Sequence, residues 1–495
     1  MNKLPRNPVI YEINTPVWLY DLSRKYGGAI TLANVPATEW DALASFHIQA
    51  VWFMGVWERS PISVQISNQN PDLIREFQKA LPDYAPGDNI GSAYSVRSYQ
   101  VDDLWGGNQG LASARAALAS RGIRTILDFV PNHVARDHRW VSEHPEYFIH
   151  GEIDDLLGKS GYYFESNETV IACGKDPFYP PWEDVAQLNA FHPALRSAAV
   201  DTLTEIAAMC DGVRCDMAML LLNPVFSETW GEKAGKMPNS EYWSVVIEAI
   251  RLEHPDFLFI AEAYWDKEPE LRSLGFDYCY DKKYYDHLVS GSADLILADL
   301  TRDREEQSHT LRFIENHDER RAAAAFPIRK ALLASIAMAT VPGAKLFHDG
   351  QFEGRRASVP VFLRRRMVEE INEDQIRFYQ RLVRSSSSAL LQNGYWKLCC
   401  INGWQDNHSY LSIVSWSWQQ DDQILLVILN FADHPSQGMV QVPWERVKGS
   451  SWRLVDLIKG DVFERSGDEM SSTGLFVDLP GWDFHLLWFS RKISA

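Results

Sequence analysis

Short runs of apolar and β-branched residues alternate with longer helical patterns through the first three quarters of the sequence. The short runs predict eight strands, over residues 9–13, 50–54, 125–130, 212–215, 258–261, 276–280, 310–314 and 344–347. A helical apolar period and frequent alanine predict helices between them, over residues 110–121, 193–209, 240–253 and 321–340. These repeats predict an α/β fold with a (β/α)8 TIM barrel, and a doubly wound open sheet is the structural alternative.

Two long segments interrupt the alternation of strands and helices. Residues 134–191 follow the third strand and are polar and rich in Gly, Pro and aromatics, too long for an ordinary connection. They predict a small subdomain inserted over one side of the barrel mouth, which divides the barrel into residues 1–133 and 192–384. Residues 63–89, after the second strand, are polar and contain proline, and they predict a loop that could include a short helix.

The pattern changes after the polar linker at residues 385–388. Strands with alternating apolar and polar positions then follow one another, which predicts a carboxy-terminal antiparallel β-sandwich over residues 389–495. Tryptophans in this part could bind polysaccharide, although packing in the core is the main expectation for them: Trp404, Trp416, Trp418 and Trp452.

Composition and charge exclude several classes of protein. With 46% hydrophobic and 23% charged residues, neither a disordered nor a fibrous chain fits. The net charge of −18 makes nucleic acid an unexpected partner. Six cysteines without CxxC spacing indicate reduced thiols, and the early prolines argue against a signal peptide. We therefore expect a cytoplasmic protein with no membrane partner.

Carboxylates stand where four predicted strands end. Asp128 closes the third strand, Asp216 the fourth and Glu262 the fifth, while Asp318 follows the seventh. In a (β/α)8 barrel the carboxyl ends of the strands meet at the active site, so these side chains are expected to converge. Such convergence suits glycosidic bond cleavage, in which one carboxylate attacks, one transfers a proton and one stabilises the positive transition state.

The neighbours of these carboxylates suggest how the roles divide. Arg214 stands two residues before Asp216 and points to the same side of its strand, where its charge favours an ionised nucleophile. Glu262 must be protonated to act as the acid, and the charge of neighbouring aspartates would raise its pKa. A retaining mechanism also predicts that the carboxyl groups of Asp216 and Glu262 lie about 5 to 5.5 Å apart.

These segments, in this order, resemble the conserved regions of the α-amylase family, glycoside hydrolase family 13. The resemblance implies that Asp216 is the nucleophile, Glu262 the general acid/base and Asp318 the transition-state stabiliser. It also implies that Asp128 supports the site through hydrogen bonds with the arginine. The residues expected to bind substrate are Tyr94, His133, Arg214 and His317. Outer sugar platforms could come from Trp57, Trp182, Tyr264, Trp265 and Phe352.

One departure from the family pattern concerns metal binding and specificity. Met219 and Leu220 stand where starch α-amylases carry a Lys-His pair that serves sugar binding and, through the His, a calcium site. Asn132 matches one calcium ligand position, but the six to eight oxygens that calcium needs cannot be assembled from the sequence. We therefore predict no cofactor and no obligatory metal, and an ordinary endo-acting starch amylase is not favoured.

The expected function is a retaining α-glycoside hydrolase that cleaves α-glucans or α-linked oligosaccharides through a glycosyl intermediate on Asp216. A transglycosylase, or a sucrose- or trehalose-type enzyme of the same family, is the alternative. A catalytically silent carbohydrate-binding protein is a third, less favoured reading, because all three carboxylates are present. The linkage, endo or exo action and oligomeric state stay open.

Overall fold

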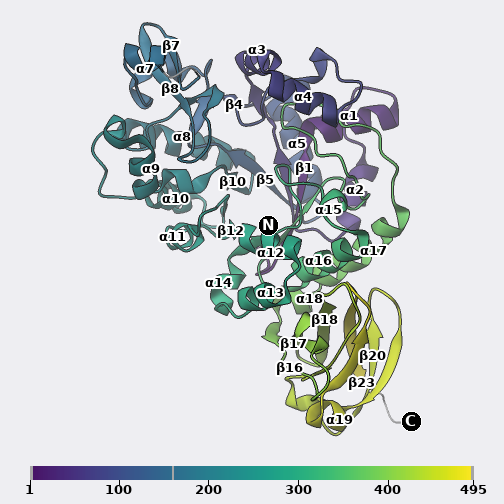
Figure 1. Ribbon diagram of the computed structural model, residues 1–495. Coiled ribbons are helices and arrows are strands. Elements are labelled where there is room, and N and C mark those ends of the chain that lie inside the picture. Colours follow the sequence, from purple (N-terminus) through teal and green to yellow (C-terminus); the bar gives the residue numbers. More distant parts are fainter. Residues whose placement is uncertain (1–3, 159–160, 492–495) are drawn as a thin grey trace.

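The computed structural model describes residues 4–158 and 161–491 and contains a closed parallel barrel (Figure 1). Nearly all residues of its strands are buried, as apolar runs in a sheet covered on both faces require. The ring runs through β1 (Val9–Asn14), β2 (Ala50–Met54), β5 (Arg124–Phe129), β10 (Gly212–Cys215), β11 (Leu258–Ala261), β12 (Tyr278–Tyr280), β13 (Thr310–Arg312) and β14 (Ala344–His348). The predicted fold class is confirmed, and β12 and β13 are shorter than expected.

Helices surround the barrel, and four of them overlap the predicted segments: α5 (Gly107–Ala119), α8 (Pro193–Met209), α10 (Tyr242–Glu253) and α16 (Ile328–Thr340). A continuous helix over 321–340 is a wrong prediction. Pro327 separates α16 from the short α15 (Ala322–Ala325), because proline fits the start of a helix but not its interior. Further helices are α1 (Thr15–Tyr26), α2 (Ala37–Ser45), α9 (Asn223–Trp230), α11 (Glu268–Ser273), α12 (Lys282–Ser290), α13 (Ala293–Leu300), α14 (Arg304–Ser308) and α17 (Glu373–Ser386).

A small unit is inserted between β5 and α8, at the upper left of Figure 1. Its antiparallel sheet has the order β6 (His133–Ala135), β9 (Trp182–Gln187), β8 (Thr169–Gly174) and β7 (Tyr163–Ser166). The short helices α6 (Trp140–Glu143) and α7 (Ile153–Gly158) complete it. Val134, Trp140, Phe148 and Ile171 form part of a separate apolar core, which explains how the insertion holds its shape.

The segment after β2 is more ordered than its polar sequence predicts. It contains a two-stranded antiparallel sheet of β3 (Trp57–Arg59) and β4 (Val96–Val101), and between these strands lie α3 (Pro61–Gln69) and α4 (Pro71–Ala80). The Ser60 hydroxyl accepts from the Ser63 amide at 3.0 Å, and Asn70 Oδ1 accepts from the Asp72 amide at 2.9 Å. Both helices therefore have capped starts with proline in the first position, and the segment holds two helices where a loop with at most a short helix was predicted.

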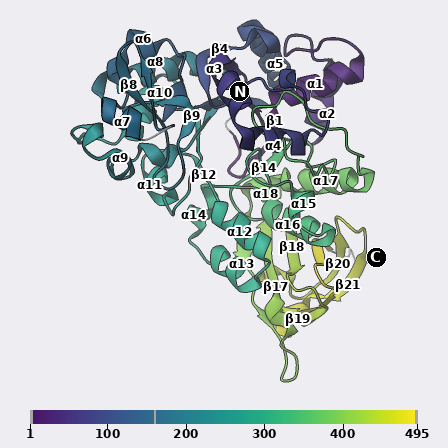
Figure 2. The ribbon, with the colours of Figure 1, turned by 45° about the horizontal axis from the view of Figure 1, so that its top comes forward.

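Two antiparallel sheets follow the barrel, in green and yellow in Figures 1 and 2. The larger has the order β15 (Tyr395–Leu398), β17 (Ile413–Gln420), β18 (Gln423–Asn430), β23 (Phe484–Arg491), β20 (Ser451–Asp456) and β21 (Val462–Ser466). The smaller joins β16 (Ile401–Asn402), β19 (Ser436–Val440) and β22 (Leu475–Leu479). Two short helices, α18 (Ala389–Asn393) and α19 (Gly467–Ser472), accompany them.

The tryptophans of this carboxy-terminal part serve mainly in packing. Trp416, Trp418 and Trp452 are buried, whereas Trp404 is 41% exposed. The indole nitrogens of Trp416 and Trp418 both donate to the carbonyl of Thr340, at 3.0 and 2.6 Å. Because Thr340 ends α16, these two hydrogen bonds attach the sheet directly to a barrel helix.

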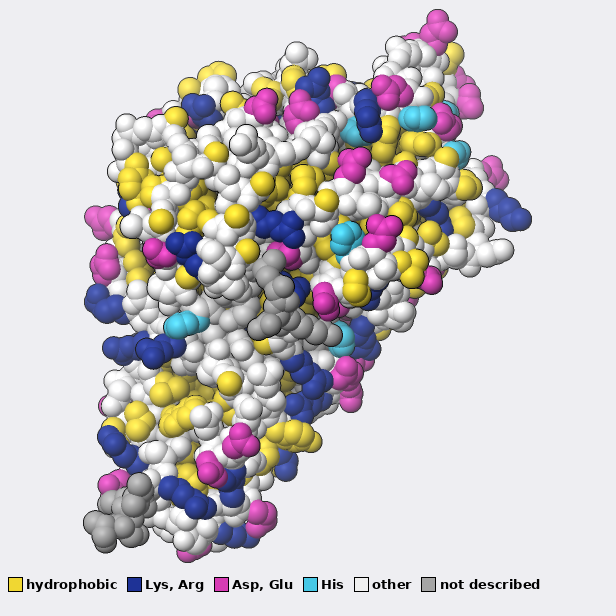
Figure 3. All heavy atoms as spheres, turned by 180° about the vertical axis from the view of Figure 1, so that it is seen from behind, with side chains coloured by type: hydrophobic (Ala, Val, Ile, Leu, Met, Phe, Trp, Pro, Cys, Tyr) yellow, Lys and Arg dark blue, Asp and Glu magenta, His cyan; other side chains and the backbone are white. Residues whose placement is uncertain are grey.

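The described surface carries both signs of charge. On the face in Figure 3, Lys and Arg side chains and Asp and Glu side chains are interspersed among hydrophobic and uncharged areas. All six cysteines are free thiols, and only Cys400 is exposed. Within residues 4–158 and 161–491, no helix combines the length and apolarity needed to cross a membrane.

Candidate active site

Three of the four predicted carboxylates, Asp216, Glu262 and Asp318, line one cavity at the carboxyl ends of the barrel strands. Asp216 and Glu262 extend the parallel ladder by one residue, since the Asp216 amide donates to Phe129 at 2.8 Å and the Glu262 amide to Cys215 at 3.1 Å. A cavity of about 360 Å³ lies above them. It is lined by Ser92, Tyr94, His133, Trp182, Asp184, Val185, Asp216, Met217, Glu262, Tyr264, Asp318, Val361 and Phe362.

Arg214 joins the two central carboxylates from below. Its Nη1 donates to Asp216 Oδ1 at 2.7 Å, and its Nη2 lies 2.9 Å from Glu262 Oε2. The Tyr280 hydroxyl accepts from Arg214 Nε at 3.2 Å, which completes a buried guanidinium site. The contact of one planar cation with both carboxylates fixes their relative orientation.

The protonation of the two central carboxylates differs. Burial raises the pKa of Glu262 to about 7, with the charges of Asp216 and Asp318 adding to the rise and Arg214 opposing it. Burial also raises the pKa of Asp216, against the charge and hydrogen bond of Arg214. Burial rather than neighbouring aspartates is therefore the main reason why Glu262 can hold a proton near neutral pH.

His317 connects Asp318 to the barrel floor. Its Nδ1 lies 2.6 Å from Glu12 Oε1, and its Nε2 lies 2.6 Å from the Tyr94 hydroxyl and 3.0 Å from Asp318 Oδ2. Burial alone would lower the pKa of His317, but Asp318 and Glu12 raise it well above its ordinary value. The charge and the hydrogen bond of the imidazole in turn lower the pKa of Asp318.

Glu12 was not among the residues predicted from the sequence. It is fully buried on β1 and contacts His317 from beneath the cavity. A carboxylate inside a strand that is otherwise apolar and predicted to be buried is the signal that could have identified it.

Asp128 has other partners than the resemblance implies. Its Oδ1 accepts from Trp52 Nε1 and its Oδ2 from the Gly55 amide, each at 3.2 Å. Arg214 acts on it only through its charge, which opposes the burial that raises the Asp128 pKa to about 7. The expectation that Asp128 forms hydrogen bonds with the arginine is therefore wrong. Asp128 instead binds Trp52 and the Gly55 amide, and so positions the loop after β2.

The aromatic and imidazole side chains around the cavity form two packed pairs, His133 with Trp182 and Tyr94 with His317. His133 packs against Trp182 with ring centroids 5.1 Å apart, and burial lowers its pKa to about 4, so it is neutral. Tyr94 stacks on His317 at 5.3 Å. Both Tyr94 and His133 therefore present rigid groups to the cavity that contains Asp216.

The predicted outer platforms are only partly available to a sugar. Trp57 and Phe352 are buried in the core and cannot stack on substrate, which corrects that expectation. Trp182 and Tyr264 line the cavity, and the Tyr264 hydroxyl donates to Glu262 Oε1 at 2.9 Å. Trp265 instead packs against Phe178 of the insertion, with ring centroids 4.9 Å apart.

The residues around Asn132 do not fit calcium. The buried Gln187 donates through Nε2 to the side-chain oxygen and backbone carbonyl of Asn132 and to the carbonyl of Leu188, each at 3.0 Å. An amide donor thus stands among the oxygens that a cation would need. Within the described ranges, no group of three or more His, Cys, Asp or Glu residues could hold a metal ion.

Replacing this amide by a carboxylate is expected to make stability depend on calcium. In Gln187→Glu, a buried anion would face three carbonyl oxygens, lowering the free energy of unfolding by about 2 kcal/mol. Millimolar Ca²⁺ should restore much of the loss, because carboxylate and carbonyl oxygens are its preferred ligands. Thermal unfolding with and without Ca²⁺ measures this effect. Gln187→Met is the uncharged control, and equal Ca²⁺ responses of the two variants would refute the interpretation.

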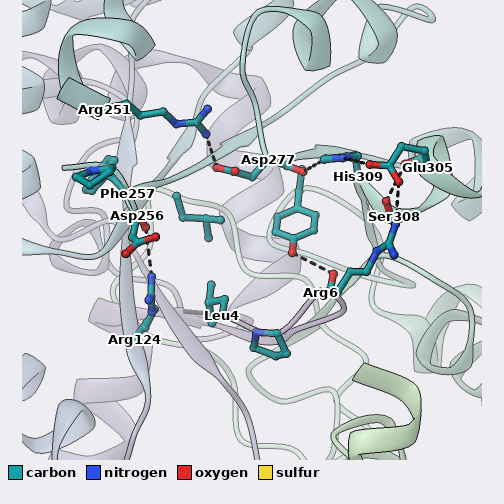
Figure 4. Close-up of a pocket in the computed structure, with 14 residues that line it drawn as sticks. Leu4, Arg6, Arg124, Arg251, Asp256, Phe257, Asp277, Glu305, Ser308 and His309 are labelled. Atoms are coloured by element: carbon teal, nitrogen blue, oxygen red, sulfur yellow. Dashed lines mark hydrogen bonds and ion pairs between the residues drawn. The ribbon is translucent and has the colours of Figure 1, made fainter. Parts of the chain in front are cut away.

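A larger cavity, of about 550 Å³, lies at the opposite end of the barrel, where the strands begin (Figure 4). Its charged side chains point toward one another in the close-up. Arg251 pairs with Asp277 at 2.9 Å, and Arg6 pairs with Glu305 at 2.8 Å. These groups neutralise each other, and none of the predicted catalytic residues lies there.

Comparison with known proteins agrees with the geometry. Residues 47–275 match the family model described as the catalytic domain of alpha amylase. The α-amylase MalA of Haloarcula japonica is 28% identical over 248 residues, which are 48% of this chain and 33% of that protein. The chain therefore spans about a third of the length of this curated relative. The α-amylase family resemblance is confirmed.

Solved structures share the whole architecture at low sequence identity. The maltogenic α-amylase AmyB of Thermotoga neapolitana has a TM-score of 0.69 at 17% identity, with 98% of this chain and 99% of that chain covered. A debranching enzyme of Nostoc punctiforme has a TM-score of 0.67 at 16% identity, with 98% and 100% covered. At these identities the likeness establishes the fold.

Proposed function

We propose that this α-amylase-family protein, whose catalytic domain matches over residues 47–275, is a retaining glycoside hydrolase that cleaves α-glucosidic bonds in α-glucans or oligosaccharides. The observation that carries the proposal is the contact of Arg214 with both Asp216 and Glu262 in a cavity also lined by Asp318. This arrangement supplies the paired carboxylates and the additional anion that an oxocarbenium-like transition state requires.

The reaction would proceed in two steps. Asp216 attacks the anomeric carbon as Glu262 gives its proton to the departing glycosidic oxygen, which leaves a covalent glycosyl ester on Asp216. Glu262, now ionised, takes a proton from water, and the resulting oxygen nucleophile displaces Asp216 from the anomeric carbon. Asp318 and the neighbouring His317 hold the sugar hydroxyls while positive charge develops on the ring.

The stereochemistry of the first product tests the proposal. A retaining enzyme releases the α-anomer from an α-linked substrate, because two displacements each invert the anomeric carbon. We expect the α-anomer at early time points when maltoheptaose hydrolysis is followed by proton NMR. Release of the β-anomer would refute the covalent intermediate, and products longer than the substrate would identify a transglycosylase.

The pH dependence of kcat/KM is expected to be bell-shaped. Glu262 must be protonated and its raised pKa is about 7, so activity should fall as the pH rises above about 7. Activity should also fall on the acid side as Asp216 becomes protonated. In Glu262→Gln the alkaline limb should disappear, and substrates with a nitrophenolate leaving group should retain more activity than maltoheptaose because they need no proton. An unchanged alkaline limb in this variant would reject the assignment.

A further inference from the structure

Two segments far apart in the sequence form one wall of the active-site cavity. Residues 88–93 precede β4, and residues 359–367 follow β14. The two segments lie antiparallel, with a bridge between Asn89 and Leu363. The hydrogen bonds run from the Ile90 amide to Phe362 at 2.8 Å, from the Ala93 amide to Val361 at 3.3 Å and from the Arg364 amide to Asp88 at 3.0 Å.

This wall is packed and anchored. Arg365 Nε lies 2.6 Å from Asp88 Oδ1, and Arg365 Nη1 lies 3.1 Å from Asp83 Oδ1. Behind the wall, Phe77 and Leu363 are fully buried in a separate apolar cluster. Since backbone hydrogen bonds, ion pairs and buried side chains all hold it, the wall is a fixed part of the fold.

A single buried arginine links both segments. Arg59 Nη1 donates to the carbonyl of Gly91 at 2.6 Å and to the carbonyl of Val361 at 2.8 Å. Burial lowers the pKa of Arg59 to about 10, which leaves it charged at neutral pH. Gly55 makes room for it, because a Cβ at that position would lie 2.7 Å from Arg59 Nη2.

The wall lies across the barrel from the proposed acid. In the ring of strands, β2 and β14 flank β1, and β11 stands opposite β1. Glu262 follows β11, whereas the two wall segments belong to the connections after β2 and β14. The acid contacts the leaving-group oxygen, so the leaving group occupies the Glu262 side. The retained sugar therefore points toward Val361 and Phe362, which line the cavity.

We propose that this wall closes the cavity beyond the retained sugar, so that the enzyme removes a mono- or disaccharide from the non-reducing ends of α-linked chains. Arg59 is the positioning residue that holds the wall in place. The inference rests on the proposed function and names its substrate class. The cavity of about 360 Å³ supports it, since this volume is near the lower end of the range of small-molecule sites, about 300 to 1,000 Å³.

Two substrates that differ only at the non-reducing end test whether the wall closes the cavity. Maltoheptaose that is reduced at one end offers a free non-reducing end, and the same chain with its terminal 4- and 6-hydroxyls bridged by an ethylidene group does not. We expect glucose or maltose to be released from the free chain, and cleavage of the blocked chain to be slower by about 100-fold, because misplacement in the site removes the productive geometry. Cleavage of both chains at similar rates would overturn the inference.

Variants of the wall test the role of Arg59. In Arg59→Met and, separately, Phe362→Ala, cleavage of the blocked chain should rise about 10-fold relative to the free chain as the wall loosens. Arg97→Met is the matched control, since Arg97 is half exposed and pairs with Glu58. In this control, the rate of cleavage of the blocked chain relative to the free chain should equal that of the wild type. Unchanged ratios in both wall variants would overturn the proposed role of the wall.

Binding measurements on an inactive variant test the closed cavity independently of the proposed hydrolysis. Calorimetry should show that the Asp216→Asn variant binds the free chain, and that it binds the blocked chain about 100-fold more weakly. If neither chain is cleaved by the wild type but this difference in binding is found, the proposed hydrolysis fails and the closed cavity stands. Equal binding of the two chains would refute the closure whether or not cleavage occurs.

Discussion

Asp216→Asn is expected to lower kcat by about 10⁴- to 10⁶-fold, the range found when a covalent catalyst loses its nucleophile. The amide is a poor nucleophile at the anomeric carbon, whereas its size and shape match those of the carboxylate. Glu262 lies 2.9 Å from Arg214 and, without the Asp216 charge that helps to raise its pKa, can ionise in the variant and balance the guanidinium. The measurement is single-turnover kinetics on maltoheptaose, with circular dichroism to verify folding.

Azide supplies the control for this assignment. In Asp216→Gly, azide can enter the vacated space and displace the leaving group directly, which gives the β-glycosyl azide after a single inversion. In Glu262→Gly, azide should attack the glycosyl ester and give the α-glycosyl azide after two inversions. Identical anomers from the two variants, or wild-type turnover in Asp216→Asn, would contradict the division of roles.

Asp281→Ala is expected to lower the free energy of unfolding by about 3 to 5 kcal/mol, because it leaves a buried cation without its carboxylate. Asp281 Oδ2 lies 3.1 Å from Nε of Arg312, which is fully buried, and 2.9 Å from Arg302 Nη2. Its Oδ1 also accepts from the Tyr284 amide and caps α12. Urea unfolding followed by tryptophan fluorescence measures the loss.

The pH dependence of this loss has a definite sign. Burial opposes ionisation of Asp281, but Arg312 and Arg302 lower its pKa below the ordinary 3.8. The carboxylate therefore stabilises the fold at neutral pH, and its contribution is lost as the pH falls through the lowered pKa. The difference between wild type and variant should shrink below pH 3.8. Asp286→Ala, which removes an exposed partner of Lys282, should change stability by less than about 1 kcal/mol, and an equal loss there would refute the argument.

The barrel was predictable because its strands have a simple physical signature. Strands buried on both faces appear as short apolar runs, so β2, β10 and β11 have the predicted bounds. The carboxylates at the strand ends could be found for the same reason, since the end of each run marks the mouth. Trp57 and Phe352 also follow strands, yet they are buried in the core. The direction in which a side chain points cannot be predicted from its position in the sequence alone.

Features that depend on long-range contacts were not predictable. The contact between Arg59 and Val361 joins residues 302 positions apart, and neither segment carries a local pattern that indicates the other. The helices α3 and α4 were predicted only as a loop with at most a short helix, for a different reason. Their caps at Ser60 and Asn70 are local signals, but the polar composition of the segment outweighed them.

The attachment of the carboxy-terminal sheet to α16 bears on how this protein could be divided or fused. The last carbonyls of a helix have no partner within it, and at Thr340 the acceptor is satisfied by two indoles from β17. Shortening the chain ahead of β17 would leave this carbonyl buried without a donor, or open to water beside an uncovered apolar face. The sheet is thus a structural component of the barrel, and the two should unfold as a single cooperative unit rather than as exchangeable modules.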